Sequence, residues 1–260
     1  MIERITILGG QGRNGVREPV ERVDLRMGDV VTIVGPTGSG KTTLINDIEL
    51  FADGDTPTGR RVLFDGVPAP EAYRDDPSKN PIALITQHTT FLSDLPVGEF
   101  LHAHARIRHG EGETAARVAE ALAFANQLTG EPIDAGVRMT ELSGGQTRAL
   151  LIADAAIICD TPIVLLDEVE NAGIHRTRAM ELLRPYRKIF IFVTHDPRIA
   201  LLSDYRIVLK EGRMMQVLTT DDNEKAFADK VTRLDDALAH LRDRLRLGFR
   251  LEGLELEGIA

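Results

Sequence analysis

The sequence predicts an α/β protein built on a largely parallel sheet, and three observations support this prediction. Apolar runs of strand length alternate along the chain with segments whose apolar residues recur at helical spacing. A glycine-rich turn joins one such strand, Val30–Val34, directly to a helical segment. Two further apolar strands, Ile163–Leu166 and Ile189–Val193, also end in polar residues. Because ligands bind outside the carboxyl ends of the strands in such sheets, we expect the functional residues at that edge.

The composition is that of a globular, acidic chain. It has 260 residues, of which 43% are hydrophobic, enough for one large domain or one domain with an appendage. The net charge of −9 argues against nonspecific nucleic-acid binding through the bulk surface. Cys159 is the only cysteine, which excludes an intrachain disulfide and a cysteine metal cluster. Its apolar neighbours predict a buried, inert thiol.

Neither a signal peptide nor a membrane-spanning segment is expected. The N-terminal residues lack the basic region and the long apolar run of a signal peptide. No uncharged apolar run reaches the roughly 18 residues that a membrane span needs. We therefore expect a cytoplasmic protein that would reach the membrane only through a partner.

The turn after Val30–Val34 matches the pattern Gly, four residues, Gly-Lys-Ser/Thr, which binds phosphates. Its glycines let successive backbone N–H groups point into one hollow, and the helix that follows adds partial positive charge. Lys41 can reach the β- and γ-phosphates, and the Thr42 hydroxyl can ligate Mg²⁺. A plain glycine-rich turn before a helix is the disfavoured alternative. The expected nucleotide-binding residues of this loop are Gly35, Pro36, Thr37, Gly38, Ser39, Gly40, Lys41, Thr42 and Thr43.

Shorter segments on both sides of the loop predict strands and surface turns. Ile2–Leu8, Val20–Leu25 and Arg61–Phe64 have strand patterns. The polar, proline-interrupted segment Pro68–Pro81 predicts a surface loop. Two strands near the end of the main region would form a closing hairpin about Glu211–Gly212.

Three helices are expected between the strands that start at Ile82 and at Ile163. Pro96–His109 and Thr114–Leu128 would form a small helical subdomain, and Gly144–Ile158 would form a further helix. The first helix carries three histidines. Two of them lie two positions apart and do not share a helix face, so a metal site is disfavoured. These histidines are His102, His104 and His109.

The C-terminal segment predicts an amphipathic helix of about three turns, because its leucines recur at helical spacing. We expect this helix to dock on the main domain, and the alternative is that it pairs with a second copy of the chain. The leucines are Leu234, Leu238, Leu241 and Leu245.

Two carboxylates follow the strand Ile163–Leu166. Asp167 would bind the Mg²⁺ shell of a nucleotide, and Glu168 would accept a proton from the attacking water or polarise it. Two acidic residues at a strand end are common by themselves, and the phosphate loop favours the nucleotide role.

A second glycine-rich turn, Leu142–Gln146, has the sequence LSGGQ and precedes a helix. Backbone N–H groups, a serine hydroxyl and a helix N-terminus can all face an anion there, so a second, weaker phosphate site is predicted. The alternative is an ordinary helix start with Ser143 as its N-cap.

These motifs together make the chain resemble an ATP-binding cassette (ABC) ATPase over about residues 1–218. The resemblance implies a P-loop NTPase core with a small antiparallel β part, a helical subdomain at about 91–160 and a C-terminal helical extension at 219–260. The matching features, in family order, are the phosphate loop Gly35–Thr42, the glutamine-loop residue Gln87, the signature Leu142–Gln146, the second Walker motif Ile163–Glu168 and the switch histidine His195.

The resemblance also implies that two cassettes meet head to tail, with ATP and Mg²⁺ between the phosphate loop of one and the signature of the other. Gln87 would sense Mg²⁺ and the attacking water, and His195 would contact the γ-phosphate. The implied catalytic residues are Glu168, His195, Gln87 and Lys41, the signature contacts are Ser143, Gly144, Gly145 and Gln146, and the metal ligands are Thr42, Gln87 and Asp167.

The chain departs from the family pattern in two places. It has no aromatic residue upstream of the phosphate loop to stack on adenine, so Arg13 or Arg17 would stack instead. Val169 stands where the family usually has proline, and Glu170–Ile174 replaces the usual Ser-Ala-Leu-Asp loop. That loop normally runs along the dimer seam, so the coupling of the two sites would differ.

The partner is left open between two candidates. Phe91–Phe100 resembles the segment that forms part of a permease-binding groove in transporter cassettes, which favours an ATP-binding subunit at the inner face of a membrane. The departures from the family favour a soluble ATPase that remodels or activates a protein or cofactor assembly. A DNA-repair role is disfavoured because long coiled-coil or zinc insertions are missing. We therefore expect a second cassette, a permease or a soluble client, and no nucleic acid.

Overall fold

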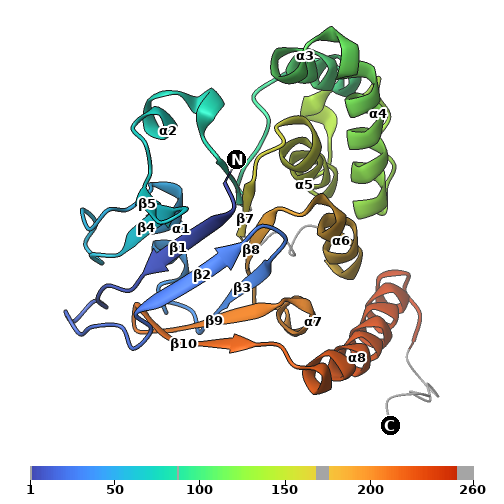
Figure 1. Cartoon of the computed structure of the whole chain (residues 1–260). Helices are drawn as coiled ribbons and strands as arrows, with labels where there is room; N and C mark the ends of the chain where they lie inside the picture. The colour runs from blue at the N-terminus through green and yellow to red at the C-terminus, as the bar shows by residue number, and fades with distance from the viewer. Residues whose placement is uncertain (1, 87, 168–175, 251–260) are drawn as a thin grey trace.

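The computed structural model describes residues 2–86, 88–167 and 176–250, and they form two sheets and a group of helices (Figure 1). The large sheet has the strand order β10-β9-β3-β8-β7-β6. Its strands are parallel except for β10, which pairs antiparallel with β9. They span β3 (Val30–Val34), β6 (Ile82–Thr86), β7 (Ile163–Asp167), β8 (Ile189–Val193), β9 (Tyr205–Lys210) and β10 (Arg213–Thr219).

A small antiparallel sheet packs against one side of the large one, in the order β2-β1-β4-β5. Helix α1 (Lys41–Glu49) shares an apolar core with both sheets, and its buried residues include Ile5, Val31, Leu44 and Leu165. The predicted α/β fold with a small antiparallel part is thus confirmed. The strands are β1 (Arg4–Leu8), β2 (Arg22–Arg26), β4 (Arg61–Phe64) and β5 (Val67–Pro68).

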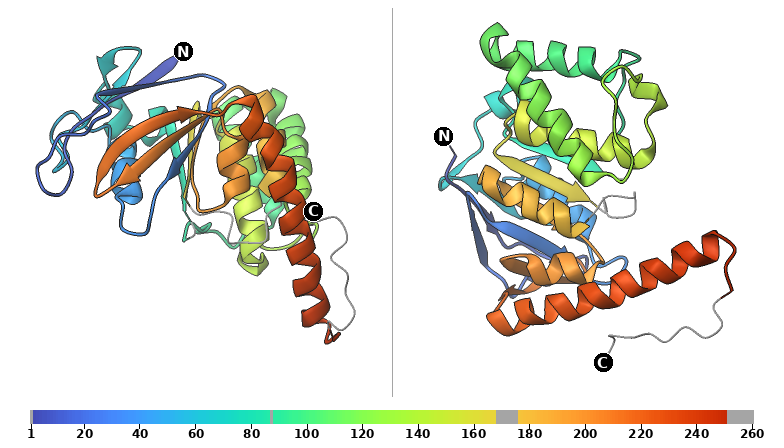
Figure 2. Two further views of the ribbon diagram at one scale, coloured as in Figure 1. Left: turned by 90° about the horizontal axis from the view of Figure 1, so that it is seen from below. Right: turned by 90° about the vertical axis from the view of Figure 1, so that its right-hand side faces the viewer.

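Helices cover the other face of the large sheet and pack against it through a second core (Figures 1 and 2). Leu101, Ala121, Leu128 and Leu150 are fully buried there. The helices of this side are α3 (Val97–His109), α4 (Glu111–Leu128), α5 (Gly144–Ala153), α6 (Arg176–Leu183) and α7 (Pro197–Leu202). In the described residues no helix has the length and apolarity that a bilayer crossing requires.

Two element boundaries differ from the sequence prediction for local reasons. Helix α4 begins at Glu111 and not at Thr114, since Gly110 has a positive φ of 75° that ends α3 and lets the next helix start at once. The predicted loop Pro68–Pro81 contains a short helix, α2 (Ala72–Asp75), and a 3₁₀ turn that Asp76 caps by accepting a hydrogen bond from the Ser78 N–H.

The predicted helix Gly144–Ile158 is regular only to Ala153 and continues as a π-helix, Asp154–Ile158. The Cys159 N–H donates to the Asp154 carbonyl at 2.8 Å, which is the bond of a wider turn. Side chains from α3 and α4 satisfy the last carbonyls of this turn. His109 Nε2 lies 2.5 Å from the Ile158 oxygen, and an Arg117 nitrogen lies 3.1 Å from the Ile157 oxygen.

The prediction that Cys159 is buried is wrong, and the prediction that its thiol is inert stays a prediction. Its thiol is partly exposed, and Sγ lies 3.8 Å from His104 Nε2 and 3.6 Å from Asp154 Oδ2. His104 Nδ1 in turn lies 2.8 Å from Asp154 Oδ1. The hydrogen bond with Asp154, and secondarily the one with Cys159, raises the pKa of His104 to about 10.

The C-terminal helix α8 (Asp222–Arg246) is longer than predicted, because Asp221 caps it by accepting a hydrogen bond from the Glu224 N–H at 2.8 Å. Its first part packs on α7 and buries Ala228. The rest extends past the body of the protein (Figure 2), where Leu234 and Leu238 are about half exposed, at 45% and 47%.

Candidate nucleotide site

The phosphate loop links the end of β3 to the start of α1, as the motif predicts. Gly40 has a φ of 99°, and a Cβ at this position would lie 2.8 Å from the Gly212 Cα, so both the backbone and the space require glycine. Helix α1 begins at Lys41, whose ammonium group donates to the carbonyls of Gly35 at 2.9 Å and Pro36 at 3.3 Å. The ammonium group is therefore held against the carbonyls at the start of the loop.

The residues of the loop fit a bound phosphate chain. Ser39 Oγ is buried and has no hydrogen-bond partner in the protein, which is unfavourable unless a ligand supplies one. The Ser39 carbonyl meanwhile accepts a hydrogen bond from the Gly212 N–H at 2.8 Å, so this loop is fixed from the side of the β9–β10 hairpin. Thr42 is exposed in the first turn of α1, where its hydroxyl is available to a metal ion.

A hollow of about 400 Å³ adjoins the loop. Its lining includes Arg13, one of the two arginines expected to stack on adenine, whereas Arg17 does not line it. The hollow is also lined by three residues that the sequence does not predict: Asn14, Lys210 and Glu211. The phosphate loop and the β9–β10 hairpin that they adjoin come together only in the folded chain. Nothing in the local sequence around these three residues signals a site.

A buried ion cluster braces the same region. Arg60 is fully buried, and its guanidinium donates to Glu18 at 2.6 and 3.1 Å and to Asp47 of α1 at 2.9 Å. It also donates to the Gly212 carbonyl at 2.8 Å. The cluster therefore joins β4, α1 and the hairpin that contacts the phosphate loop. No local sequence pattern indicates this cluster, since its three charged residues are not adjacent in the chain.

Asp167 ends β7 at the same edge of the sheet as the phosphate loop. In register it lies beside Thr86 of β6 and Val193 of β8. Because β8 separates β7 from β3, Asp167 lies about two strand spacings, roughly 10 Å, from the strand that leads into the loop. Asp167 and the phosphate loop thus share one edge of the sheet.

His195 follows β8 and is exposed at this edge. The next residue, Asp196, accepts a hydrogen bond from the Arg198 N–H at 2.8 Å and forms a largely buried ion pair with the Arg198 guanidinium at 2.9 Å. The Thr194 hydroxyl accepts from the Asp196 N–H at 2.8 Å. His195 thus lies between two anchored residues just before α7, and no sequence pattern indicates this constraint.

The signature turn lies at the start of α5, within the helical group. Ser143 Oγ accepts from the Gln146 N–H at 3.3 Å, and Gln146 Oε1 accepts from the Ser143 N–H at 2.9 Å, which is a reciprocal capping box. Ser143 and Gly144 are exposed, and Gly145 is half-buried. The turn is therefore both a helix start, as the plainer interpretation predicted, and a surface that offers backbone N–H groups to an anion.

Several predicted residues fall outside the described part of the chain. These are Gln87, Glu168 and the departing segment Val169–Ile174. On the amino-terminal side of Gln87, the Thr86 N–H donates to Thr89 Oγ1 at 2.9 Å.

Comparisons with known proteins agree with this arrangement. The family model described as ABC transporter matches residues 21–171. An uncharacterised ABC transporter ATP-binding protein of Methanocaldococcus jannaschii is 47% identical over 250 residues, covering 96% of this chain and 95% of the relative. A sulfate/thiosulfate import ATP-binding protein of Mesorhizobium japonicum is 30% identical over 77% of this chain. An ATP-dependent lipid A-core flippase of Paraburkholderia xenovorans is 31% identical, but the match spans only 34% of the flippase.

Solved structures show the same fold. A dimeric ATP-binding cassette in a post-hydrolysis state, bound to ADP and Pi, superposes with a TM-score of 0.63 at 25% identity, covering 84% of this chain and 99% of that one. A cassette from Clostridium perfringens, part of an ABC transporter complex, has a TM-score of 0.63 at 22% identity over 96% of this chain. The extent of the family match and the near full-length relative lead to one conclusion: the chain belongs to the ABC transporter family of ATP-binding proteins and is an ABC-type ATPase.

Proposed function

We propose that the chain binds Mg²⁺-ATP between two copies arranged head to tail and uses its hydrolysis to drive a conformational change in a partner. The observation that carries this proposal is the phosphate loop itself, with the Lys41 ammonium hydrogen-bonded to the Gly35 carbonyl and with the buried Ser39 hydroxyl, which has no hydrogen-bond partner in the protein. The exposed N-terminus of α5 at Ser143 supports a second contact to the same nucleotide from another copy.

The proposed roles follow from position. Lys41 and the loop N–H groups would hold the β- and γ-phosphates, and Thr42 with Asp167 would hold Mg²⁺, which supplies positive charge to the phosphates during transfer. Glu168 would accept the proton of the attacking water, and His195, exposed beside its anchored neighbours, would contact the γ-phosphate. Gln87 would orient the water and the metal ion.

The domain boundaries are also proposed. An ATPase unit would span residues 1–218, with a helical subdomain at about 91–160, and residues 219–260 would form an extension. The end of β10 at Thr219 and the start of α8 at Asp222 support the last boundary.

We propose that the partner is a membrane permease, with this chain as the ATP-binding subunit at the cytoplasmic face. The names of the relatives, which describe them as transporter components, support this assignment. A soluble ATPase that remodels a protein or cofactor assembly is the second candidate, favoured by the unusual segment Val169–Ile174. Recovery of the chain from detergent-solubilised membranes with a multi-span protein supports the first, and recovery only with a soluble enzyme contradicts it.

The dimer is tested with the variant Glu168→Gln. Removing the proposed base should trap ATP and convert the chain to a stable dimer in sizing chromatography with light scattering. The double variant Lys41→Ala, Glu168→Gln should remain monomeric with ATP. Glu71→Gln, which changes an exposed carboxylate of a surface segment, is the matched control and should behave as the unmodified chain. Unchanged turnover in Glu168→Gln contradicts the assignment of the base.

A further inference from the structure

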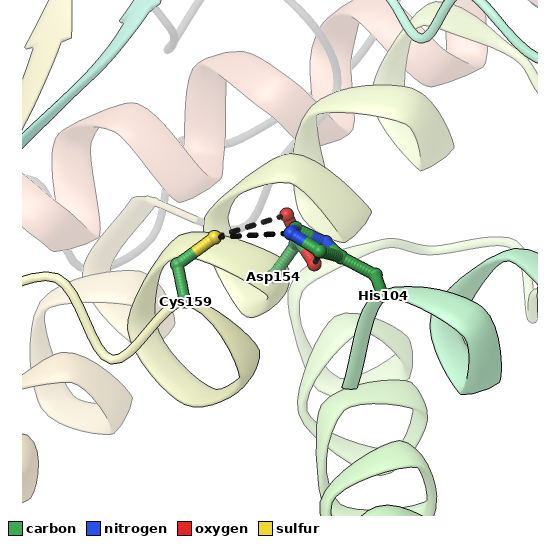
Figure 3. Close-up of side chains that lie close together, drawn as sticks. All are labelled: His104, Asp154 and Cys159. Carbon is green, nitrogen blue, oxygen red and sulfur yellow. Dashed lines mark hydrogen bonds and ion pairs between the residues drawn. The ribbon is translucent and has the colours of Figure 1, made fainter. Parts of the chain in front are cut away.

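Three side chains of different chemistry lie close together between α3 and the π-helix that follows α5 (Figure 3). His104 comes from the middle of α3, Asp154 from the first residue of the π-helix after α5, and Cys159 from the residue that follows the π-helix. One nitrogen, one carboxylate oxygen and the sulfur of these residues all lie within 4.8 Å of one another. The nucleotide site uses none of them.

We propose that His104, Asp154 and Cys159 bind a divalent transition-metal ion of the zinc type, each through one ligand atom: an imidazole nitrogen, a carboxylate oxygen and the thiolate sulfur. Nitrogen, carboxylate oxygen and thiolate sulfur are together the donor set that Zn²⁺ accepts, and three protein ligands leave a fourth position for water.

The distances fit tetrahedral coordination. With metal–nitrogen and metal–sulfur bonds of about 2.1 and 2.3 Å, a tetrahedral angle places a nitrogen and a sulfur about 3.6 Å apart. The structure has 3.8 Å between His104 Nε2 and Cys159 Sγ, and 3.6 Å between Asp154 Oδ2 and Cys159 Sγ. The nitrogen–sulfur and oxygen–sulfur distances are therefore both within about 0.2 Å of the tetrahedral value.

The π-helix is what places two of the ligands together. In a regular α-helix, residues five positions apart point about 140° away from each other. The wider turn, closed by the bond from the Cys159 N–H to the Asp154 carbonyl, brings their side chains to one face. His109 and Arg117 hold the carbonyls of this turn, so neighbouring helices maintain the distortion. Such turns occur frequently at functional sites.

The imidazole ring of His104 is held in place beside the sulfur. Its Nδ1 faces Asp154 Oδ1 at 2.8 Å, which leaves Nε2 directed at the sulfur. The hydrogen bond with Asp154 fixes the orientation of the imidazole ring. Phe100 packs beside the imidazole, with ring centroids 6.0 Å apart, and restricts its rotation further.

Cys159 also lines a surface cavity of about 750 Å³, so the thiol is reachable from solvent. An ion bound here would tie α3 to the end of the helix that begins with the signature turn. The metal would thereby stiffen the helical group without contacting the nucleotide.

The test uses the full chain, stripped with EDTA and assayed without nucleotide, with Co²⁺ as the spectroscopic probe. One equivalent of Co²⁺ should produce the near-ultraviolet charge-transfer band of a cobalt–thiolate bond. Cys159 is the only cysteine of the chain, so the band reports this site alone. Cys159→Ser should abolish the band, and His104→Gln should weaken Co²⁺ binding by at least about tenfold.

The matched control is His102→Gln, which changes an exposed histidine on the same helix and should leave the titration unchanged. Alkylation of the unmodified chain by iodoacetamide gives a readout that does not depend on a variant folding. Zn²⁺ should slow alkylation of Cys159, and EDTA should restore the rate.

Three results would each overturn the proposal. They are the absence of a charge-transfer band at one equivalent, saturation at half an equivalent (which indicates an ion shared between two chains), and an alkylation rate that Zn²⁺ does not change. A fourth such result is equal weakening of Co²⁺ binding by His102→Gln and His104→Gln. None of these readouts depends on ATP turnover, so failure here leaves the nucleotide-site proposal intact.

Discussion

Replacing Arg60 by leucine tests whether the buried ion cluster beside the phosphate loop stabilises the fold. The substitution removes four hydrogen bonds and leaves the carboxylates of Glu18 and Asp47 buried without their cation. Removing one partner of a buried ion pair destabilises a protein by about 3–5 kcal/mol. Adding the energies of the four separate bonds would give a larger loss. However, Glu18 still accepts a hydrogen bond from the Gly10 N–H and Asp47 still accepts one from the Thr58 hydroxyl, so we expect the free energy of unfolding to fall by about 3–5 kcal/mol in total.

The measurement is urea unfolding followed by circular dichroism. With a slope of about 3 kcal/mol per M, the midpoint should fall by about 1–1.7 M. Arg61→Leu is the matched control, because the neighbouring arginine forms an ion pair with Asp53 in which both side chains are substantially exposed, at 48% and 39%. Such a pair contributes less than about 1 kcal/mol. Midpoints of the two variants within about 0.3 M of each other would refute the reasoning.

Further predictions concern the phosphate loop, the helical core and one tyrosine. Gly40→Ala should lower stability by about 1–3 kcal/mol and weaken ATP binding in calorimetry, because the new Cβ meets the hairpin backbone at 2.8 Å and the φ of 99° disfavours side chains. Leu101→Ala should destabilise by about 2–5 kcal/mol in thermal unfolding, since Leu101 is fully buried, whereas Leu92→Ala at a fully exposed position should change little. Partial burial and a hydrogen bond to Glu120 raise the pKa of Tyr186 to about 12. Because the folded state holds this proton more tightly than the unfolded state, the contribution to stability is complete below pH 10 and is lost as the pH rises toward 12.

Each of these predictions has a clear contrary outcome. If Gly40→Ala bound ATP as tightly as the unmodified chain, the hairpin could move away from the new Cβ without disturbing the loop, which would contradict the prediction. Equal unfolding temperatures for the Leu101 and Leu92 variants would contradict the position of the helical core. An ultraviolet titration in which all three tyrosines ionise together near pH 10 would contradict the environment described for Tyr186.

The short-range patterns of the sequence were sufficient for much of the fold. The central strands, the phosphate loop before α1 and the hairpin at Glu211–Gly212 are each determined by local chemistry, such as β-branched runs and glycines with positive φ. Both turn residues of the hairpin indeed have positive φ, 55° and 81°. These elements could be located without knowledge of their neighbours.

The rest depends on contacts between distant segments. Asp154–Ile158 departs from an α-helix, and side chains of α3 and α4 form hydrogen bonds to its last carbonyls. No periodicity within the segment indicates the π-helix. Cys159 has apolar neighbours in sequence but polar neighbours in space. At the nucleotide site, Asn14 and Lys210 meet across the hollow only after the hairpin has formed.

The contact between the hairpin and the phosphate loop has a consequence for the order of folding. Arg60 and Gly212 are 152 residues apart, and the Gly212 backbone also supports Gly40 and Ser39. The loop can reach its final shape only after this distant pairing forms, and pairings of large sequence separation form slowly. A nascent chain that ends before the hairpin would therefore contain the complete phosphate-binding motif but would not yet bind nucleotide, and affinity for ATP would appear only when the last strands are in place.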